Sequence, residues 1–300
     1  MIAVASWKGW EISQLDVKSA FLNGPLEEEV YVRQPPGFER KGEEHKVFIL
    51  HKALYGLKQA SRGRNKCIDA FLLHIGFSKC TIEYGVYVKV ISPNNLLLIC
   101  LYVDDLLVTG DSQPEIELFK QKMNSEFEMT DLGRLNYFLG LEFKHTSKEI
   151  LLHQRRYISG VLSKFHMADY HSVPIPVIAN LKLGEATDER LVDATLYKQV
   201  VGSLRYVCNS IPDISYRVSL VSCFMNSLRT SHLAAAKHIL IYLKGTTELG
   251  LFFPRRTSQD EGNMEVWTDS NWCGDRIDRR STFRYFFRYM HAPISWCSKK

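Results

Sequence analysis

The chain has 300 residues, 45% of them hydrophobic and 24% charged, and a formal net charge of +5. This composition excludes a disordered chain and is typical of a soluble globular protein of roughly two domains. No apolar run approaches the about 18 residues of a membrane-spanning helix, so we expect no membrane partner. The N-terminus lacks the basic region of a signal peptide, which indicates an intracellular protein, either cytoplasmic or nuclear. The seven cysteines are scattered without zinc-site spacing, so we expect buried thiols.

The first predicted strand ends near Asp16. Residues 10–17 alternate between apolar and polar side chains, and a short helical turn follows that ends at Asn23 and Gly24. Asp16 therefore lies where a strand passes into a helical turn. Its carboxylate either projects into a cleft or caps the helical turn. The local pattern leaves both interpretations open.

Two short strands, a loop and a helix are expected next. The strands lie at residues 30–32 and at the start of residues 46–62, whose remainder forms a loop with Lys52, Lys58 and Arg62. These three cations can contact phosphates or remain solvated. Residues 65–79 have the spacing of an amphipathic helix, and residues 84–91 lead into the most apolar part of the chain.

That part, residues 96–110, reads LLLICLYVDDLLVTG. Two apolar runs of strand length meet at Asp104 and Asp105, which predicts a β-hairpin that turns at the two aspartates. Adjacent carboxylates repel each other, and a bound divalent metal ion would relieve that repulsion. Aspartate is also a common turn residue that needs no ligand, so the hairpin alone is compatible with either interpretation.

The rest of the chain continues the alternation of strands and helices. We expect a helix over residues 114–127, a strand over 137–143 that bends at Gly140, and a partner strand over 150–152. Further helices are predicted at 157–165, 196–209, 214–228 and 231–243, and further strands at 264–267, 282–289 and 294–296. The predicted fold class is α+β with a largely antiparallel sheet, followed by a helical region.

Residues 271–300 carry seven Lys or Arg against two Asp. Clustered cations beside aromatic residues suit a nucleic-acid backbone, although a solvated basic tail has the same composition.

Asp16, Asp104 and Asp105 together have the arrangement that a two-metal phosphoryl transferase needs. Two Mg²⁺ ions held about 3.5 to 4 Å apart by shared carboxylates can activate an attacking hydroxyl and stabilise the leaving oxygen. Mg²⁺ keeps waters and phosphate oxygens as ligands, so few protein carboxylates suffice.

Five segments in order resemble the reverse transcriptase of Ty1/copia-type LTR retrotransposons, namely QLDVKSAFLNG, LYGLKQA, YVDDLLVTG, YFLGLEF and VGSLRYV. TDSNW and DRRST resemble the start of the RNase H domain that follows it. The resemblance covers nearly the whole chain and implies an RNA-directed DNA polymerase shaped like a right hand. It implies a palm over residues 1–150 with the fingers largely missing, a helical thumb or connection over 151–262, and a truncated RNase H start over 263–300.

The resemblance also implies roles for single residues. Asp16 and Asp104 would bind two Mg²⁺ ions, with Mn²⁺ as an alternative, and Asp105 would complete the acidic cluster. Phe21 matches the aromatic gate that crowds a ribose 2′-hydroxyl. The other implied positions are Tyr55, Gly56, Lys58 and Tyr102 for substrate binding, Leu139, Gly140 and Glu142 for primer positioning, and Asp269 as an RNase H remnant. The implied partners are an RNA or DNA template with its primer and dNTPs; the oligomeric state is left open.

The chain departs from the family pattern in three places. Met1 lies 15 residues before Asp16, so the cations of a fingers segment are missing, and we expect a rate lower by several orders of magnitude. Residues 61–65 replace the usual Pro-Arg-x-Trp-Tyr by Ser-Arg-Gly-Arg-Asn, which removes aromatic core residues from the following helix.

Phe283 and Arg284 replace the usual small pair of the RNase H start, and the chain ends before further carboxylates, so no nuclease activity is expected. The alternative to an active polymerase is therefore an inactive retroelement relic with residual nucleic-acid binding through Lys52, Lys58, Arg62 and the basic tail.

Overall fold

The computed structural model describes all residues except 94, 179–182, 185–188, 227, 257–262 and 275–278. Asp275, Arg276 and Asp278 of the basic tail thus lie outside the described residues. The described chain forms two compact units, one of Trp10–Leu135 with Met1 and one of Asn136–Lys300 with Ile2–Gly9. Both units combine helices with antiparallel sheets, which confirms the α+β class. None of the described helices has the length and apolar character needed to cross a bilayer.

The first unit is built on a six-stranded antiparallel sheet with the strand order β4-β5-β6-β7-β1-β8. Its strands are β1 (Ile12–Val17), β4 (Ser78–Lys79), β5 (Val86–Ser92), β6 (Asn95–Tyr102), β7 (Asp105–Gly110) and β8 (Met129–Arg134). The strands β6, β7 and β1 lie inside this sheet, and β6 and β7 carry the two apolar runs of residues 96–110. The sequence pattern did not predict β8, which pairs with the other side of β1.

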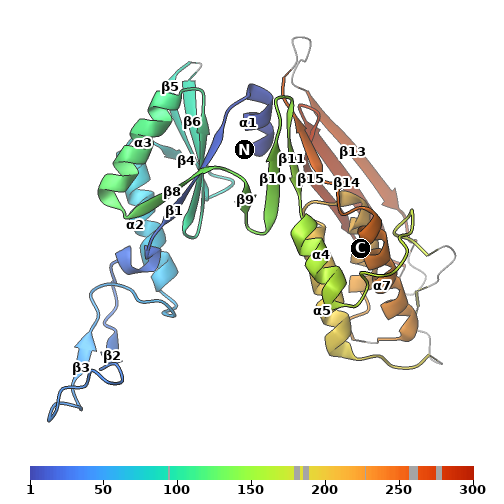
Figure 1. The fold of residues 1–300 in the computed structure, drawn as a ribbon, viewed down its shortest axis with the longest axis horizontal. Helices are drawn as coiled ribbons and strands as arrows, with labels where there is room; N and C mark the ends of the chain where they lie inside the picture. Colours follow the sequence, from blue (N-terminus) through green and yellow to red (C-terminus); the bar gives the residue numbers. More distant parts are fainter. Residues whose placement is uncertain (94, 179–182, 185–188, 227, 257–262, 275–278) are drawn as a thin grey trace. The chain divides into compact units, whose positions relative to one another are not determined.

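Two helices cover one face of this sheet, α2 (Ala60–His74) and α3 (Gln113–Glu126) (Figure 1). Side chains from both helices join Leu15, Ile99 and Leu106 of the sheet in one buried core. Alternate residues of a strand point to opposite faces, so Asp16 and Asp105 belong to the face that these helices do not cover.

Helix α2 begins five residues earlier than residue 65, where its start was predicted. Its buried residues are Ala60, Arg64, Ile68 and Leu72, which recur every four positions and so lie on one side of the helix. The polar segment that replaces the family's aromatic residues is therefore helical, and Arg64 belongs to its buried side.

A short 3₁₀ helix, η1 (Ala20–Asn23), follows β1 and ends at Gly24, as predicted. The strands β2 (Tyr31–Arg33) and β3 (Val47–Ile49) then form a separate two-stranded sheet. Although β3 is apolar, all three of its residues are exposed.

The second unit contains a four-stranded sheet, β12-β11-β10-β9, and a three-stranded sheet, β13-β14-β15. Its strands are β9 (Tyr137–Phe138), β10 (Leu141–His145), β11 (Glu149–His153), β12 (Leu251–Pro254), β13 (Met264–Asn271), β14 (Thr282–Tyr289) and β15 (Ala292–Lys299). Its helices are α1 (Ile2–Lys8), α4 (Arg155–Lys164), α5 (Ala194–Val207), η2 (Pro212–Ile214), α6 (Ser215–Ser222) and α7 (Thr230–Gly245). Apolar residues of α4 to α7 share one buried core.

Three predictions for this unit are corrected. Residues 137–143 are two antiparallel strands instead of one bent strand, because Leu139 and Gly140 both adopt positive φ and reverse the chain. The helix predicted at 214–228 is shorter and is preceded by η2 at Pro212. The strand predicted at 264–267 continues to Asn271 through its pairing with β14. The assignment of palm, thumb and RNase H portions stays a prediction.

Candidate active site

The hairpin of β6 and β7 confirms the predicted fold of residues 96–110, but its turn lies one residue earlier than predicted. Tyr102 pairs with Asp105, so Val103 and Asp104 form the two-residue turn and Asp105 begins β7. Val103 has a φ of 48°. Positive φ at the first turn residue matches the twist of the two strands, which explains why a valine is held in this unfavourable conformation.

Asp16 lies beside this turn. It is directly opposite Asp105 in the register of β1 and β7, and the next residue, Val17, donates its backbone N–H to the carbonyl oxygen of Asp104 at 2.8 Å. The cap position of η1 is occupied by Ser19, so the interpretation of Asp16 as a helix cap is wrong. The sheet thus brings the backbones of Asp16, Asp104 and Asp105 to one end of β1 and β7.

The carboxyl group of Asp104 lies in a partly buried and charged environment. Burial raises the pKa of its carboxyl above the ordinary value; the charge of Arg64 opposes this shift, and the charges of Asp16 and Asp105 add to it. Its Oδ1 atom is buried and has no hydrogen-bond donor among the described residues. Asp105 differs, because its Oδ1 accepts a hydrogen bond from Nε2 of Gln14 at 3.0 Å.

Asp16 and Asp104 supply some, but not all, of the features of a cation site. No three Asp, Glu, His or Cys side chains of the described residues gather as a ready set of metal ligands. Asp104 nevertheless offers a buried oxygen without a donor, and the nearby negative charge of Asp16 makes a cation favourable there. A divalent ion that keeps most of its waters could be held by these two carboxylates.

The residues predicted to contact substrate lie on η1, on the loop before α2 and at the end of β6. Phe21 and Tyr55 are brought together, with ring centroids 5.2 Å apart in an edge-to-face arrangement. Gly56 has a φ of 90°, which a residue with a side chain rarely adopts, and Lys58 is exposed. Tyr102 is half exposed at the end of β6.

The residues predicted to position a primer belong to the second unit. Leu139 and Gly140 form the turn between β9 and β10, where the hydroxyl of Tyr206 donates to the carbonyl oxygen of Leu139. Glu142 accepts a hydrogen bond from the backbone N–H of Arg156 at 2.8 Å and pairs with its guanidinium at 3.3 Å. Its carboxylate therefore caps the start of α4.

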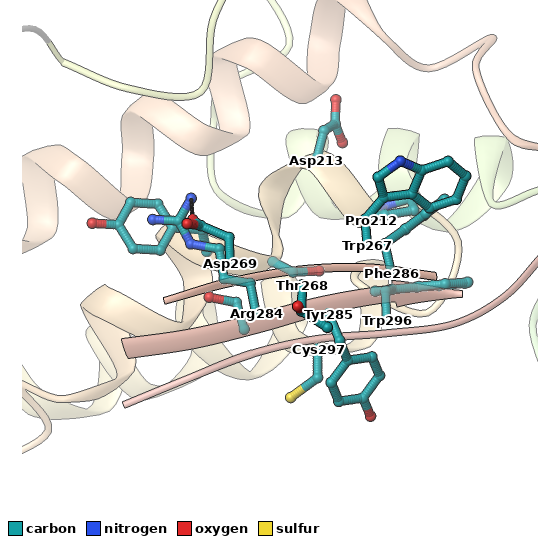
Figure 2. A pocket seen from close by; sticks show the side chains of 13 residues that line it. Pro212, Asp213, Trp267, Thr268, Asp269, Arg284, Tyr285, Phe286, Trp296 and Cys297 are labelled. Atoms are coloured by element: carbon teal, nitrogen blue, oxygen red, sulfur yellow. Dashed lines mark ion pairs between the residues drawn. The ribbon is translucent and has the colours of Figure 1, made fainter. Parts of the chain in front are cut away.

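Asp269, the predicted RNase H remnant, lies in β13 opposite Arg284 of β14. The two side chains form an ion pair at 3.6 Å, and the Arg284 guanidinium also lies 4.0 Å from the ring of Tyr216. This pair lies at one end of a cavity of about 480 Å³, with Trp267 toward its other end (Figure 2).

One residue of the site was missed by sequence reasoning. Arg64 is buried and acts electrostatically on Asp104, although it is 40 positions away. The signal that could have found it is the four-residue repeat of Ala60, Arg64, Ile68 and Leu72, in which Arg64 takes the place of an apolar residue.

The chain is similar in sequence to known reverse transcriptases and to transposon polyproteins. Residues 1–179 match the family described as "Reverse transcriptase (RNA-dependent DNA polymerase)". The chain is 38% identical over its full length to a retrovirus-related Pol polyprotein from transposon RE1 of Arabidopsis thaliana, and 37% identical to the one from transposon TNT 1-94 of Nicotiana tabacum. It spans 20% and 23% of the length of these two polyproteins.

A putative transposon Ty5-1 protein of Saccharomyces cerevisiae is 35% identical over 95% of this chain and 92% of its own length. The chain therefore belongs to the reverse transcriptase family of Ty1/copia-type retrotransposon Pol polyproteins.

Proposed function

We propose that the first unit is a polymerase palm that extends a primer on an RNA template, with Asp16 and Asp104 as ligands of divalent metal ions. The observation that carries this proposal is the register of β1 and β7, which aligns Asp16 with Asp105 beside the turn that holds Asp104. When bound, such ions would activate the primer 3′-hydroxyl and neutralise charge on the reacting phosphate. Asp105, tied to Gln14, would orient the end of β7.

The nucleotide would be held by η1 and the loop before α2. Phe21 would crowd a ribose 2′-hydroxyl, and its edge-to-face contact with Tyr55 supports this role, because that contact limits the movement of the ring. Gly56 leaves its backbone open to a close approach, and Lys58 is an exposed cation that can meet phosphate oxygens. Tyr102 would contact the nucleotide from the hairpin.

The primer would be positioned by the turn between β9 and β10. The contact of Tyr206 with Leu139 and the role of Glu142 at the start of α4 support this role, because they hold the turn rigidly. In this proposal Leu139 and Gly140 meet the primer backbone, while Glu142 acts through the helix that it caps.

Nucleic-acid binding without synthesis is the second candidate function. It is favoured by the lack of a ready three-ligand metal group among the described residues, and by the exposed cations Lys52, Lys58 and Arg62. In this case the chain would retain template binding after losing catalysis.

Primer extension with the purified chain tests both candidates. The assay would contain an RNA template with a labelled DNA primer, dNTPs, and Mg²⁺ or Mn²⁺. Asp104→Asn should abolish extension. The matched control is Asp193→Asn, because Asp193 caps α5 through Thr195 and asparagine caps a helix equally well.

Extension that both Asp104→Asn and Asp193→Asn abolish would refute the specific role of Asp104. No extension by the unaltered chain, together with template binding that weakens as salt rises, would favour the second candidate.

A further inference from the structure

Tyr206 belongs to the segment VGSLRYV of α5, which carries part of the family resemblance but has no role in the proposed chemistry. Its hydroxyl donates a hydrogen bond to the carbonyl oxygen of Leu139, which lies 67 positions earlier in the chain. Leu139 is in the turn between β9 and β10, the turn that we propose to meet the primer. This hydrogen bond therefore joins a helix to a proposed substrate-binding turn within the second unit.

The turn between β9 and β10 is short and strained. The strand before it, β9, has two residues, and the turn residues Leu139 and Gly140 have φ values of 50° and 77°. Positive φ is unfavourable for a residue with a side chain, and it persists where the surrounding structure enforces it. The turn therefore depends on contacts from neighbouring elements to keep one conformation.

The phenol ring of Tyr206 fits closely against this turn. A Cβ atom on Gly140 would lie 3.2 Å from Cζ of Tyr206, whereas ordinary contacts begin near 3.4 Å. The missing side chain of Gly140 thus provides the space that the phenol ring occupies. Gly140 serves the turn in two ways, because it also adopts the positive φ without strain.

Tyr206 is itself held in place by its surroundings. Its ring lies edge to face with that of Tyr157 of α4, at 4.6 Å between centroids and an angle of 71°. Next to these rings, the hydroxyl of Ser210 donates to Oε1 of Gln154 at 2.7 Å, and both side chains are buried. This hydrogen bond ties the chain after α5 to the residue that precedes α4. The Tyr206 hydroxyl therefore approaches the turn from a fixed base.

We propose that Tyr206 is a positioning residue for the 3′ end of the primer and acts through the carbonyl oxygen of Leu139. The inference rests on the proposed function, because it requires that the turn between β9 and β10 meets the primer. Tyr206 does not touch the primer in this proposal. Its hydroxyl keeps the turn in one conformation, so that the primer end is held in one geometry before a nucleotide is added.

Tyr206→Phe tests the inference, because it removes the hydroxyl and keeps the ring. Tyr197→Phe is the matched control. Tyr197 lies on the same helix, and its hydroxyl also donates to a backbone carbonyl oxygen, that of Val221 at 2.7 Å. Both substitutions thus remove one hydrogen bond from a tyrosine to the backbone, and Tyr206→Phe is the one that affects the turn.

Hydrogen exchange of the full chain measures whether the hydroxyl holds the turn, and it needs no enzymatic activity. In Tyr206→Phe, the backbone amides of residues 137–142 should exchange about fivefold faster or more, because the turn opens more often. In Tyr197→Phe, their exchange should stay within about twofold of the unaltered chain. Unchanged exchange in Tyr206→Phe, or an equal increase in both variants, would overturn the inference.

Single-turnover addition of one nucleotide measures whether the turn positions the primer. At saturating primer and template, the amplitude reports the fraction of folded, primer-bound protein, and the rate constant reports the geometry of the reacting groups. Tyr206→Phe should lower the rate constant about tenfold or more at unchanged amplitude, because a small misplacement of reacting groups slows a reaction strongly. Tyr197→Phe should leave the rate constant unchanged. A loss of amplitude in Tyr206→Phe at an unchanged rate constant would indicate a purely structural role and overturn the inference.

The unaltered chain judges the proposed function separately. If it extends primers and Tyr206→Phe does so with the same rate constant, the inference fails and the proposed function stands. If the unaltered chain extends no primer, the proposed function fails, and the role of Tyr206 in primer positioning fails with it.

Discussion

Gly63→Ala tests the close packing of α2 against the end of η1. In an exposed helix, alanine is more favourable than glycine by about 0.5 to 1 kcal/mol, so helix propensity alone predicts a more stable protein. The structure predicts the opposite. The added Cβ would lie 2.8 Å from the carbonyl oxygen of Pro25, whereas ordinary contacts begin near 3.4 Å.

The clash sets the expected magnitude. The neighbour of Gly63 is backbone instead of a flexible side chain, so α2 or the Gly24–Pro25 segment has to shift by several tenths of an ångström. Such overpacking costs about 1 to 3 kcal/mol. After subtraction of the gain in helix propensity, we expect a net loss of up to about 2.5 kcal/mol, which lowers the melting temperature by up to about 10 °C.

Thermal unfolding followed by circular dichroism measures this effect. Gly202→Ala is the control, because Gly202 lies within α5 and nothing approaches its Cβ position within 4 Å. It should raise the melting temperature through helix propensity alone. If Gly63→Ala stabilised the protein as much as Gly202→Ala does, the close approach of α2 to Pro25 would be refuted.

Two further predictions concern the hairpin turn and an ion pair. Val103→Gly should stabilise the protein by about 0.5 to 1 kcal/mol, because glycine adopts the positive φ of this position without the penalty of a branched side chain; an unchanged urea midpoint would contradict it. Lys120→Met should cost about 1 kcal/mol at pH 7, since Lys120 pairs with Asp131 at 3.0 Å and Asp131 is partly exposed. Although burial raises the pKa of Asp131, the Gly133 N–H and Lys120 lower it below its ordinary value. The contribution is therefore present above the unfolded pKa and is lost as the pH falls through the folded one, so denaturation curves should show the cost shrinking below about pH 4. A cost that is the same at pH 3 and pH 7 would exclude this pair as its source.

Much of the first unit could be predicted because its signals are local. The alternation before Asp16, the Asn-Gly pair after it and the two apolar runs of residues 96–110 are each decided by neighbouring residues. The position of the turn could not be predicted in the same way. Polar residues normally mark turns. Here the register of β6 and β7 pairs Tyr102 with Asp105, so that Val103 and Asp104 form the turn.

The electrostatics of the site depend on contacts that are distant in sequence. The burial of Arg64 follows from the packing of α2 on the sheet, and a count of apolar residues cannot predict it because arginine usually faces water. Glu142 was predicted as a primer contact from resemblance alone. Its bond to the backbone of Arg156 depends on where α4 begins, which is fixed only when β10 and β11 pair.

The separate sheet of β2 and β3 has a consequence for work with the purified chain. Among the described strands these two pair only with each other, so both outer edges keep free backbone groups. Tyr31, Phe48 and Ile49 are each about half exposed on this sheet. Free edges beside apolar side chains template the addition of strands from other molecules. Aggregation in concentrated solution should therefore begin at this sheet, and Phe48→Lys should improve solubility because it places a charge beside the free edges.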